Sequence, residues 1–115
     1  MQVHSWQGIE KEQLNPLYTR QVVHSDTMTV VRVYFKKGCE VALHSHPNEQ
    51  VSMVEQGTLK FVVEGKEHLV RTGEIMRIAP NLVHSAEAME DCVMVEVFSP
   101  RRQDWIDAAA AQRSK

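Results

Sequence analysis

The most informative part of this chain is the segment GCEVALHSHPNEQ, residues 38–50. In an extended strand, side chains two residues apart point to the same face, so His44 and His46 project together and Gln50 shares their parity. Neutral imidazole is a common ligand of divalent first-row metals. A pair of histidines in a polar loop can equally be solvated surface, so the pair alone leaves both interpretations open.

The sequence around this segment is typical of an all-β protein. Short apolar stretches with period-two alternation lie between glycines and prolines. The predicted strands are Arg20–His24, Met28–Phe35, Glu40–His44, Gln50–Gln56, Leu59–Glu64, His68–Arg71, Ile75–Ala79 and Cys92–Phe98. Many short strands joined by brief turns favour a sandwich or a small barrel.

The C-terminal tail has a different pattern. Ser99 is a candidate N-cap and Pro100 suits the first position of a helix. We therefore predict a short helix over about residues 100–113, with Trp105, Ile106 and Ala109 on its apolar side.

Composition limits the possible classes of protein. The chain has 115 residues, of which 43% are hydrophobic and 24% are charged. This composition predicts one globular domain over residues 1–115, with its core at about 20–98. A formal net charge of -2 argues against a nucleic-acid partner, and the short apolar runs argue against a membrane span. We expect a cytoplasmic protein in which Cys39 and Cys92 are small buried hydrophobic residues.

The strand Cys92–Phe98 carries an acid among apolar residues. Valines occupy one face of this strand and Glu96 shares the other face, and the valine face must be packed. If the face of Glu96 points into a barrel, burial raises the pKa of its carboxyl, and such an acid is a candidate proton shuttle. The alternative is a glutamate on an edge strand that faces water.

A third histidine, His84, ends the segment Gly73–His84 beyond a Pro-Asn turn. The segment from Gly38 to Gly57 resembles the first motif of the cupin superfamily, and Gly73–His84 resembles the second. The resemblance covers about residues 20–98. It implies a double-stranded β-helix, or jelly-roll barrel, in which the two motifs supply metal ligands from neighbouring strands.

Carried over by position, the resemblance implies four metal ligands: His44, His46, Gln50 and His84. Cupins usually have a glutamate as the fourth ligand, and here Gln50 stands at that place with Glu49 beside it. Strand alternation favours Gln50, because it turns Glu49 to the opposite face. A neutral amide leaves the bound ion more positive and makes it a stronger Lewis acid. We expect a divalent transition metal, which the ligands do not narrow beyond Ni, Zn, Mn or Fe.

The stretch Glu96–Arg102 resembles one branch of small cupins, the pectin degradation proteins, which linearise 4,5-unsaturated monouronates. The resemblance implies catalytic roles for Glu96, Phe98 and Arg102, although the branch has an aspartate where Glu96 stands. Glu96 would transfer protons, Phe98 would form an apolar wall, and the planar donors of Arg102 would bind a substrate carboxylate. The competing interpretation is that Arg101 and Arg102 only solvate the first helical turn, where positive charge is mildly unfavourable.

The expected function is therefore that of a metal-dependent enzyme that opens the ring of a small unsaturated sugar acid. One alternative is an Fe- or Mn-dependent dioxygenase. Another is a non-catalytic cupin that binds a small molecule or a metal. We also expect a homodimer, because pairing would cover exposed strand edges.

Overall fold

A computed structural model describes residues 1–114 of the chain. A short 3-10 turn, Trp6–Gly8, precedes the strands and the helix α1 (Gln103–Arg113) follows them. The strands are β1 (Glu12–Asn15), β2 (Tyr18–His24), β3 (Thr29–Phe35), β4 (Glu40–His44), β5 (Glu49–Gln56), β6 (Thr58–Val63), β7 (Lys66–Arg71), β8 (Ile75–Ile78), β9 (His84–Ala88) and β10 (Cys92–Ser99).

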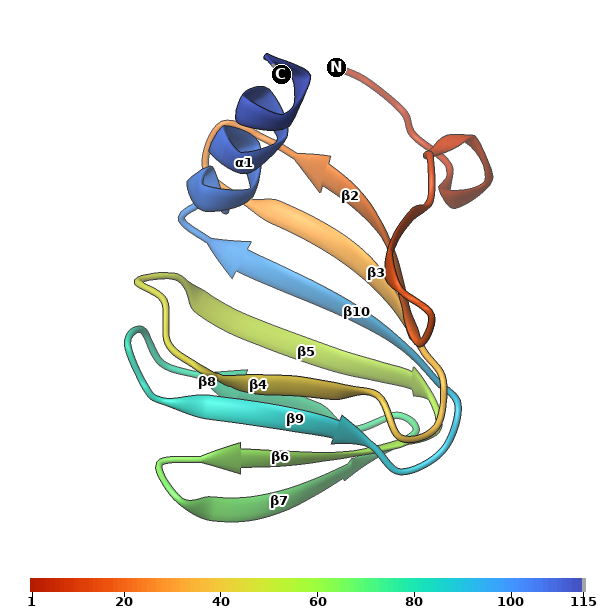
Figure 1. Cartoon of the computed structure of the whole chain (residues 1–115), viewed down its shortest axis with the longest axis vertical. Helices are drawn as coiled ribbons and strands as arrows, with labels where there is room; N and C mark the ends of the chain where they lie inside the picture. The colour runs from red at the N-terminus through yellow and green to blue at the C-terminus, as the bar shows by residue number, and fades with distance from the viewer. Residues whose placement is uncertain (115) are drawn as a thin grey trace.

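These strands form two antiparallel sheets (Figure 1). The larger sheet has the order β1-β2-β3-β10-β5-β8 and the smaller has the order β4-β9-β6-β7. In Figure 1 the helix α1 lies beyond the end of β10, beside β2. The structure confirms the prediction of an all-β jelly-roll with a short C-terminal helix.

The hydrophobic core is built from the inward faces of strands with strict alternation. In β3 the residues Thr29, Val31, Val33 and Phe35 are buried, and the residues between them are half-buried. This is the pattern expected of a strand with one face on a core. The predicted burial of Cys39 and Cys92 is confirmed, since both are buried free thiols.

Two strands were not predicted from the sequence. The strand β9 reads HSAEA and contains no β-branched residue, which is unusual for a strand. It is held between β4 and β6 by ladders on both sides. The polar strand β1 pairs only with β2, at the edge of the larger sheet.

The predicted start of the helix is wrong. Ser99 is not an N-cap but the last residue of β10, where it pairs with Glu49 of β5. The helix begins at Gln103, and Arg102 occupies the N-cap position without a side-chain capping bond. The strand ladder thus continues through Ser99 and displaces the helix start beyond Pro100. Within residues 1–114, no helix combines the length and the hydrophobicity that crossing a membrane requires.

Gly57, at the turn between β5 and β6, offers a test of how closely this turn packs against Asp91 and Cys92. Its φ is +95°, and a Cβ atom there would lie 2.5 Å from the backbone oxygen of Asp91 and 2.7 Å from Sγ of Cys92. We expect Gly57→Ala to lower the free energy of unfolding by about 2–4 kcal/mol. The strain of an alanine at positive φ and the clash of its Cβ with the backbone both contribute to this loss. Gly38→Ala is the matched control, since Gly38 has φ +88° but open space around it. There we expect a loss of about 1–2 kcal/mol. Equal losses in urea unfolding would contradict this account of Gly57.

Candidate metal centre and active site

Three histidines from two strands and one loop meet at one end of the barrel. The register of β4 and β9 sets His44 opposite His84, and His46 follows in the loop after β4. One ligand atom from each ring lies within 4.8 Å of the others. The sequence placed these residues in separate motifs, and the antiparallel ladder brings them together.

The three imidazoles share one hydrogen-bonding arrangement. In each ring, Nδ1 contacts a backbone carbonyl oxygen two residues away. The pairs are His44 with Ala42 at 2.7 Å, His46 with Asn48 at 3.0 Å and His84 with Leu82 at 2.8 Å. A carbonyl oxygen only accepts, so Nδ1 carries the proton in each ring and Nε2 keeps its lone pair. This arrangement is typical of metal-ligating histidines.

Two observations indicate that this donor set fits a cation. Nε2 of His84 is buried and has no hydrogen-bond partner among residues 1–114. Nε2 of His46 lies 3.1 Å from Oε1 of Gln50, which places two lone pairs face to face. Ligands of one zinc-sized ion at about 2.1 Å lie about 3.0–3.4 Å apart. The separation of these two atoms therefore matches shared coordination of a divalent transition metal.

The amide of Gln50 is oriented by its other end. Its Nε2 donates to Oγ of Ser52 at 3.0 Å and to Oε2 of Glu96 at 2.5 Å. This directs Oε1 toward His46. Gln50 is only 4% exposed, whereas Glu49 is exposed and faces away. The parity of the strand thus gives the side chain at position 50, not 49, access to the histidines.

Glu96 lies on the inward face of β10, opposite Ser52 of β5, and is 7% exposed. Oε2 accepts hydrogen bonds from Gln50 and from the Ser52 hydroxyl, the latter at 2.6 Å. Burial raises the pKa of the Glu96 carboxyl, and these two bonds and the charge of Arg102 act against that effect. Glu96 is therefore a buried acid and not a glutamate facing water. The valines on the opposite face of β10 are only half-buried.

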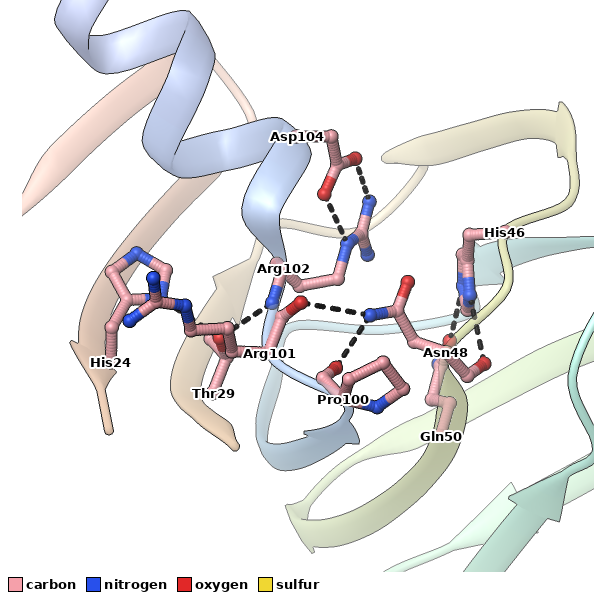
Figure 2. Close-up of polar contacts among 9 residues, drawn as sticks. All are labelled: His24, Thr29, His46, Asn48, Gln50, Pro100, Arg101, Arg102 and Asp104. Atoms are coloured by element: carbon pink, nitrogen blue, oxygen red, sulfur yellow. Dashed lines mark hydrogen bonds and ion pairs between the residues drawn. The ribbon is translucent and has the colours of Figure 1, made fainter. Parts of the chain in front are cut away.

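Arg102 is buried as well, and its surroundings were only partly predictable. Its backbone N–H donates to Oγ1 of Thr29 at 2.8 Å, and its Nε and Nη2 donate to the two carboxylate oxygens of Asp104 at 3.0 and 2.8 Å (Figure 2). The guanidinium carbon lies 4.7 Å from the centroid of the Phe98 ring. An arginine that only solvated the helix would be exposed, whereas Arg102 is 7% exposed.

Asn48 connects the metal-binding loop to the segment that carries Arg102. Its Nδ2 donates to the backbone oxygens of Pro100 at 2.5 Å and Arg101 at 3.1 Å, while the backbone oxygen of Asn48 accepts from Nδ1 of His46 (Figure 2). Asn48 is 4% exposed. Sequence reasoning missed this residue, because its partners lie about fifty positions away and no local pattern marks them.

Most of these side chains line one cavity of about 340 Å³. The predicted residues on its wall are His44, Gln50, His84, Glu96, Phe98 and Arg102. His46 is buried but does not line this cavity, and its ring packs edge-on against Phe98 with centroids 5.6 Å apart. His24 lies outside this cavity and is exposed, and its Nδ1 is 2.8 Å from Oγ1 of Thr29 (Figure 2).

The buried histidines predict how the stability of the metal-free protein depends on pH. Burial lowers the pKa of His46 and of His84 below the ordinary 6.5, and the charge of Arg102 adds to this at His46. The unfolded chain then binds more protons than the native protein below pH 6.5. We expect stability to fall as pH drops through this range, by at most about 1.4 kcal/mol per pH unit for each histidine. Urea unfolding at pH 7.5 and 5.5 checks this, and a gain in stability at acid pH would contradict it.

Comparison with known proteins identifies the family of this chain. The cupin domain family matches residues 31–98, which include both histidine motifs and Glu96. The chain therefore belongs to the cupin family.

Three individual proteins are similar to this chain over most of its length. The chain is 30% identical over 98 residues to the pectin degradation protein KdgF of Dickeya dadantii (strain 3937), covering 83% of this chain and 89% of that protein. The structure of KdgF from Halomonas sp. matches with a TM-score of 0.82 and 26% identity, covering 88% of this chain and 94% of that one. An RmlC-like cupin from Shewanella frigidimarina NCIMB 400 matches with a TM-score of 0.83 and 26% identity, covering 89% and 93%.

Proposed function

We propose that this cupin is a metal-dependent enzyme that converts 4,5-unsaturated monouronates to open-chain 5-keto-4-deoxyuronates. The observation that carries the proposal is the contact between the buried carboxylate of Glu96 and the amide of Gln50, beside the three-histidine cluster. This contact joins a proton-transfer group to a metal-binding group inside one cavity. The likeness to KdgF supports pectin-derived sugar acids as the substrate class.

The metal would be held by His44, His46, His84 and Oε1 of Gln50. When bound, it supplies Lewis-acid polarisation of substrate oxygens. Because the amide of Gln50 carries no charge, it does not reduce the positive charge of the ion as a carboxylate would. Open coordination positions would face the cavity, which distinguishes a catalytic from a structural site.

Proton transfer is assigned to Glu96. Its carboxylate removes the proton from the anomeric hydroxyl, the bond between C1 and the ring oxygen breaks, and C1 becomes an aldehyde. The electron pair of that bond leaves with the ring oxygen as the enolate of C4 and C5. Glu96 then returns the proton to C4, which leaves a ketone at C5. Raising the pKa of the carboxyl by burial suits it to carry a proton in this way.

Arg102 and Phe98 would position the sugar. The guanidinium of Arg102 binds the carboxylate on C5 with the donors that Asp104 does not use. Phe98 packs against His46 and below the guanidinium, so it forms an apolar wall that keeps water from the ring.

The direct assay is loss of the absorbance of the unsaturated uronate. Metal-free protein is reconstituted separately with Ni²⁺, Zn²⁺, Mn²⁺ and Fe²⁺ and mixed with the 4,5-unsaturated monouronate. We expect faster loss of the chromophore than in a protein-free control with at least one metal. No acceleration with any of the four would reject the proposed reaction, and oxygen uptake would instead favour dioxygenation.

Assembly as a homodimer also stays a proposal. The outward valines Val93, Val95 and Val97 are half-buried in the single chain, and a second copy could cover them. We expect light scattering to give twice the chain mass of 13.2 kDa. A mass equal to that of one chain would contradict the dimer.

A further inference from the structure

A second guanidinium lines the cavity that contains Glu96 and Arg102. It belongs to Arg20 of β2, whose side chain is 13% exposed. The guanidinium carbon of Arg20 lies 4.1 Å from the ring centroid of Trp105, and that of Arg102 lies 4.2 Å from the same centroid. Two cations therefore pack on one indole at the cavity wall.

The two arginines differ in how their donors are used. Arg102 gives Nε and Nη2 to Asp104 at hydrogen-bond distance. In Arg20, by contrast, Nε is buried and has no hydrogen-bond partner within residues 1–114. Its nearest acid is Glu12, at 3.6 Å, and that side chain is 51% exposed. An ion pair with a half-exposed acid at this distance contributes little, so Nε of Arg20 remains an unsatisfied donor.

The aromatic neighbour of Arg20 on β2 does not neutralise its charge. Tyr18 lies two residues before it on the same face of β2 and also lines the cavity. Burial raises the pKa of the Tyr18 phenol to about 12, so this neighbour offers a neutral hydroxyl. Two guanidiniums that pack on one aromatic ring repel each other, and an anion placed between the ring and the cavity would relieve this repulsion.

We propose that Arg20 binds the carboxylate of the substrate together with Arg102, and that it thereby selects sugar acids over neutral sugars. This inference rests on the proposed function of the same site. A carboxylate has two oxygens and accepts several hydrogen bonds. Because Asp104 occupies two donors of Arg102, Arg20 supplies the donors that complete the binding of the carboxylate. Trp105 holds the two guanidiniums in place through cation–π contacts.

The test measures binding without turnover. Calorimetry compares D-galacturonate with D-galactose on the zinc-loaded wild type, on Arg20→Met and on Arg77→Met. Arg77 is an exposed arginine of β8 outside the cavity, which makes it the matched control. We expect Arg20→Met to weaken galacturonate binding about 10- to 100-fold, as for loss of charge-assisted hydrogen bonds, and to leave galactose binding unchanged. Arg77→Met is expected to change neither.

Other outcomes would overturn the inference. One is a wild type that binds galacturonate no more tightly than galactose, and another is an Arg20→Met protein with wild-type affinity for galacturonate. Equal weakening for both sugars would show that Arg20 only supports the fold. If Arg20→Met does not fold, Arg20→Lys takes its place, with an expected loss of about 3- to 10-fold because the charge stays but the planar fork is lost.

Kinetics separate this inference from the proposed reaction. On the unsaturated uronate, Arg20→Met should raise KM with little change in kcat, and the methyl ester should show no such rise. A wild type that does not turn over the uronate would refute the proposed reaction. The calorimetric difference between the acid and the neutral sugar would still decide the role of Arg20.

Discussion

Replacing Glu96 with glutamine is expected to reduce kcat by about 10²- to 10⁴-fold, the usual contribution of a positioned acid or base. Glutamine has nearly the same shape as glutamate, but it cannot take the proton of the anomeric hydroxyl. Zinc or nickel content should stay at the wild-type level, because the four proposed ligands are unchanged and the amide oxygen of a glutamine can still accept the hydrogen bond from Nε2 of Gln50. Stopped-flow loss of the uronate chromophore, together with elemental analysis, gives both quantities.

A matched control is Glu40→Gln, an exposed acid on β4 that lies outside the cavity. We expect this variant to behave like the wild type in both measurements. The role of Glu96 would be contradicted by a Glu96→Gln protein with kcat near that of the wild type. A protein that binds the uronate without any turnover, in the wild type as well as in the variant, would instead point to a binding module.

The second large effect is expected from His84→Ala. Loss of a residue that only hydrogen-bonds to a metal ligand typically costs 10- to 100-fold in metal affinity, and loss of the ligand itself should cost more. The variant should therefore lose both the metal and the activity. Removal of His84 also removes the orphaned Nε2 from the interior, so the metal-free protein is expected to keep its fold.

His68→Ala serves as the control for this experiment, since His68 is exposed on β7. Metal content after dialysis against a weak chelator is the measurement. Retention of a full equivalent of metal by His84→Ala would rule out this residue as a ligand. Equal loss from His68→Ala would show that the metal is bound elsewhere.

The inward-facing residues were predictable where strand alternation decides the outcome. Parity within a strand grouped Gln50 with the histidines and separated Glu96 from the valines, but it left open which face of Cys92–Phe98 points inward. The structure buries both Gln50 and Glu96. The meeting of His84 with His44 follows from the register of β4 and β9, which the resemblance to the cupins anticipated but local propensity did not. Local propensity in fact failed for β9, because its ladders on both sides override its composition.

Residues whose roles depend on distant partners could not be predicted. Asn48 is important because it contacts the carbonyl oxygens of Pro100 and Arg101, and Thr29 because it accepts the backbone N–H of Arg102. Arg20 is notable because its Nε remains without a hydrogen-bond partner at the wall of the cavity, which only the folded protein shows. The helix start was misplaced for a similar reason, since the pairing of Ser99 with Glu49 is a tertiary contact.

The most direct test is anomalous diffraction from crystals of metal-loaded protein, collected on both sides of the absorption edge of the metal. The account predicts one peak within about 2.0–2.3 Å of Nε2 of His44, His46 and His84 and of Oε1 of Gln50. It also predicts open coordination positions toward Glu96. A peak bound by other residues, or fully loaded crystals with no peak among these four side chains, would contradict it.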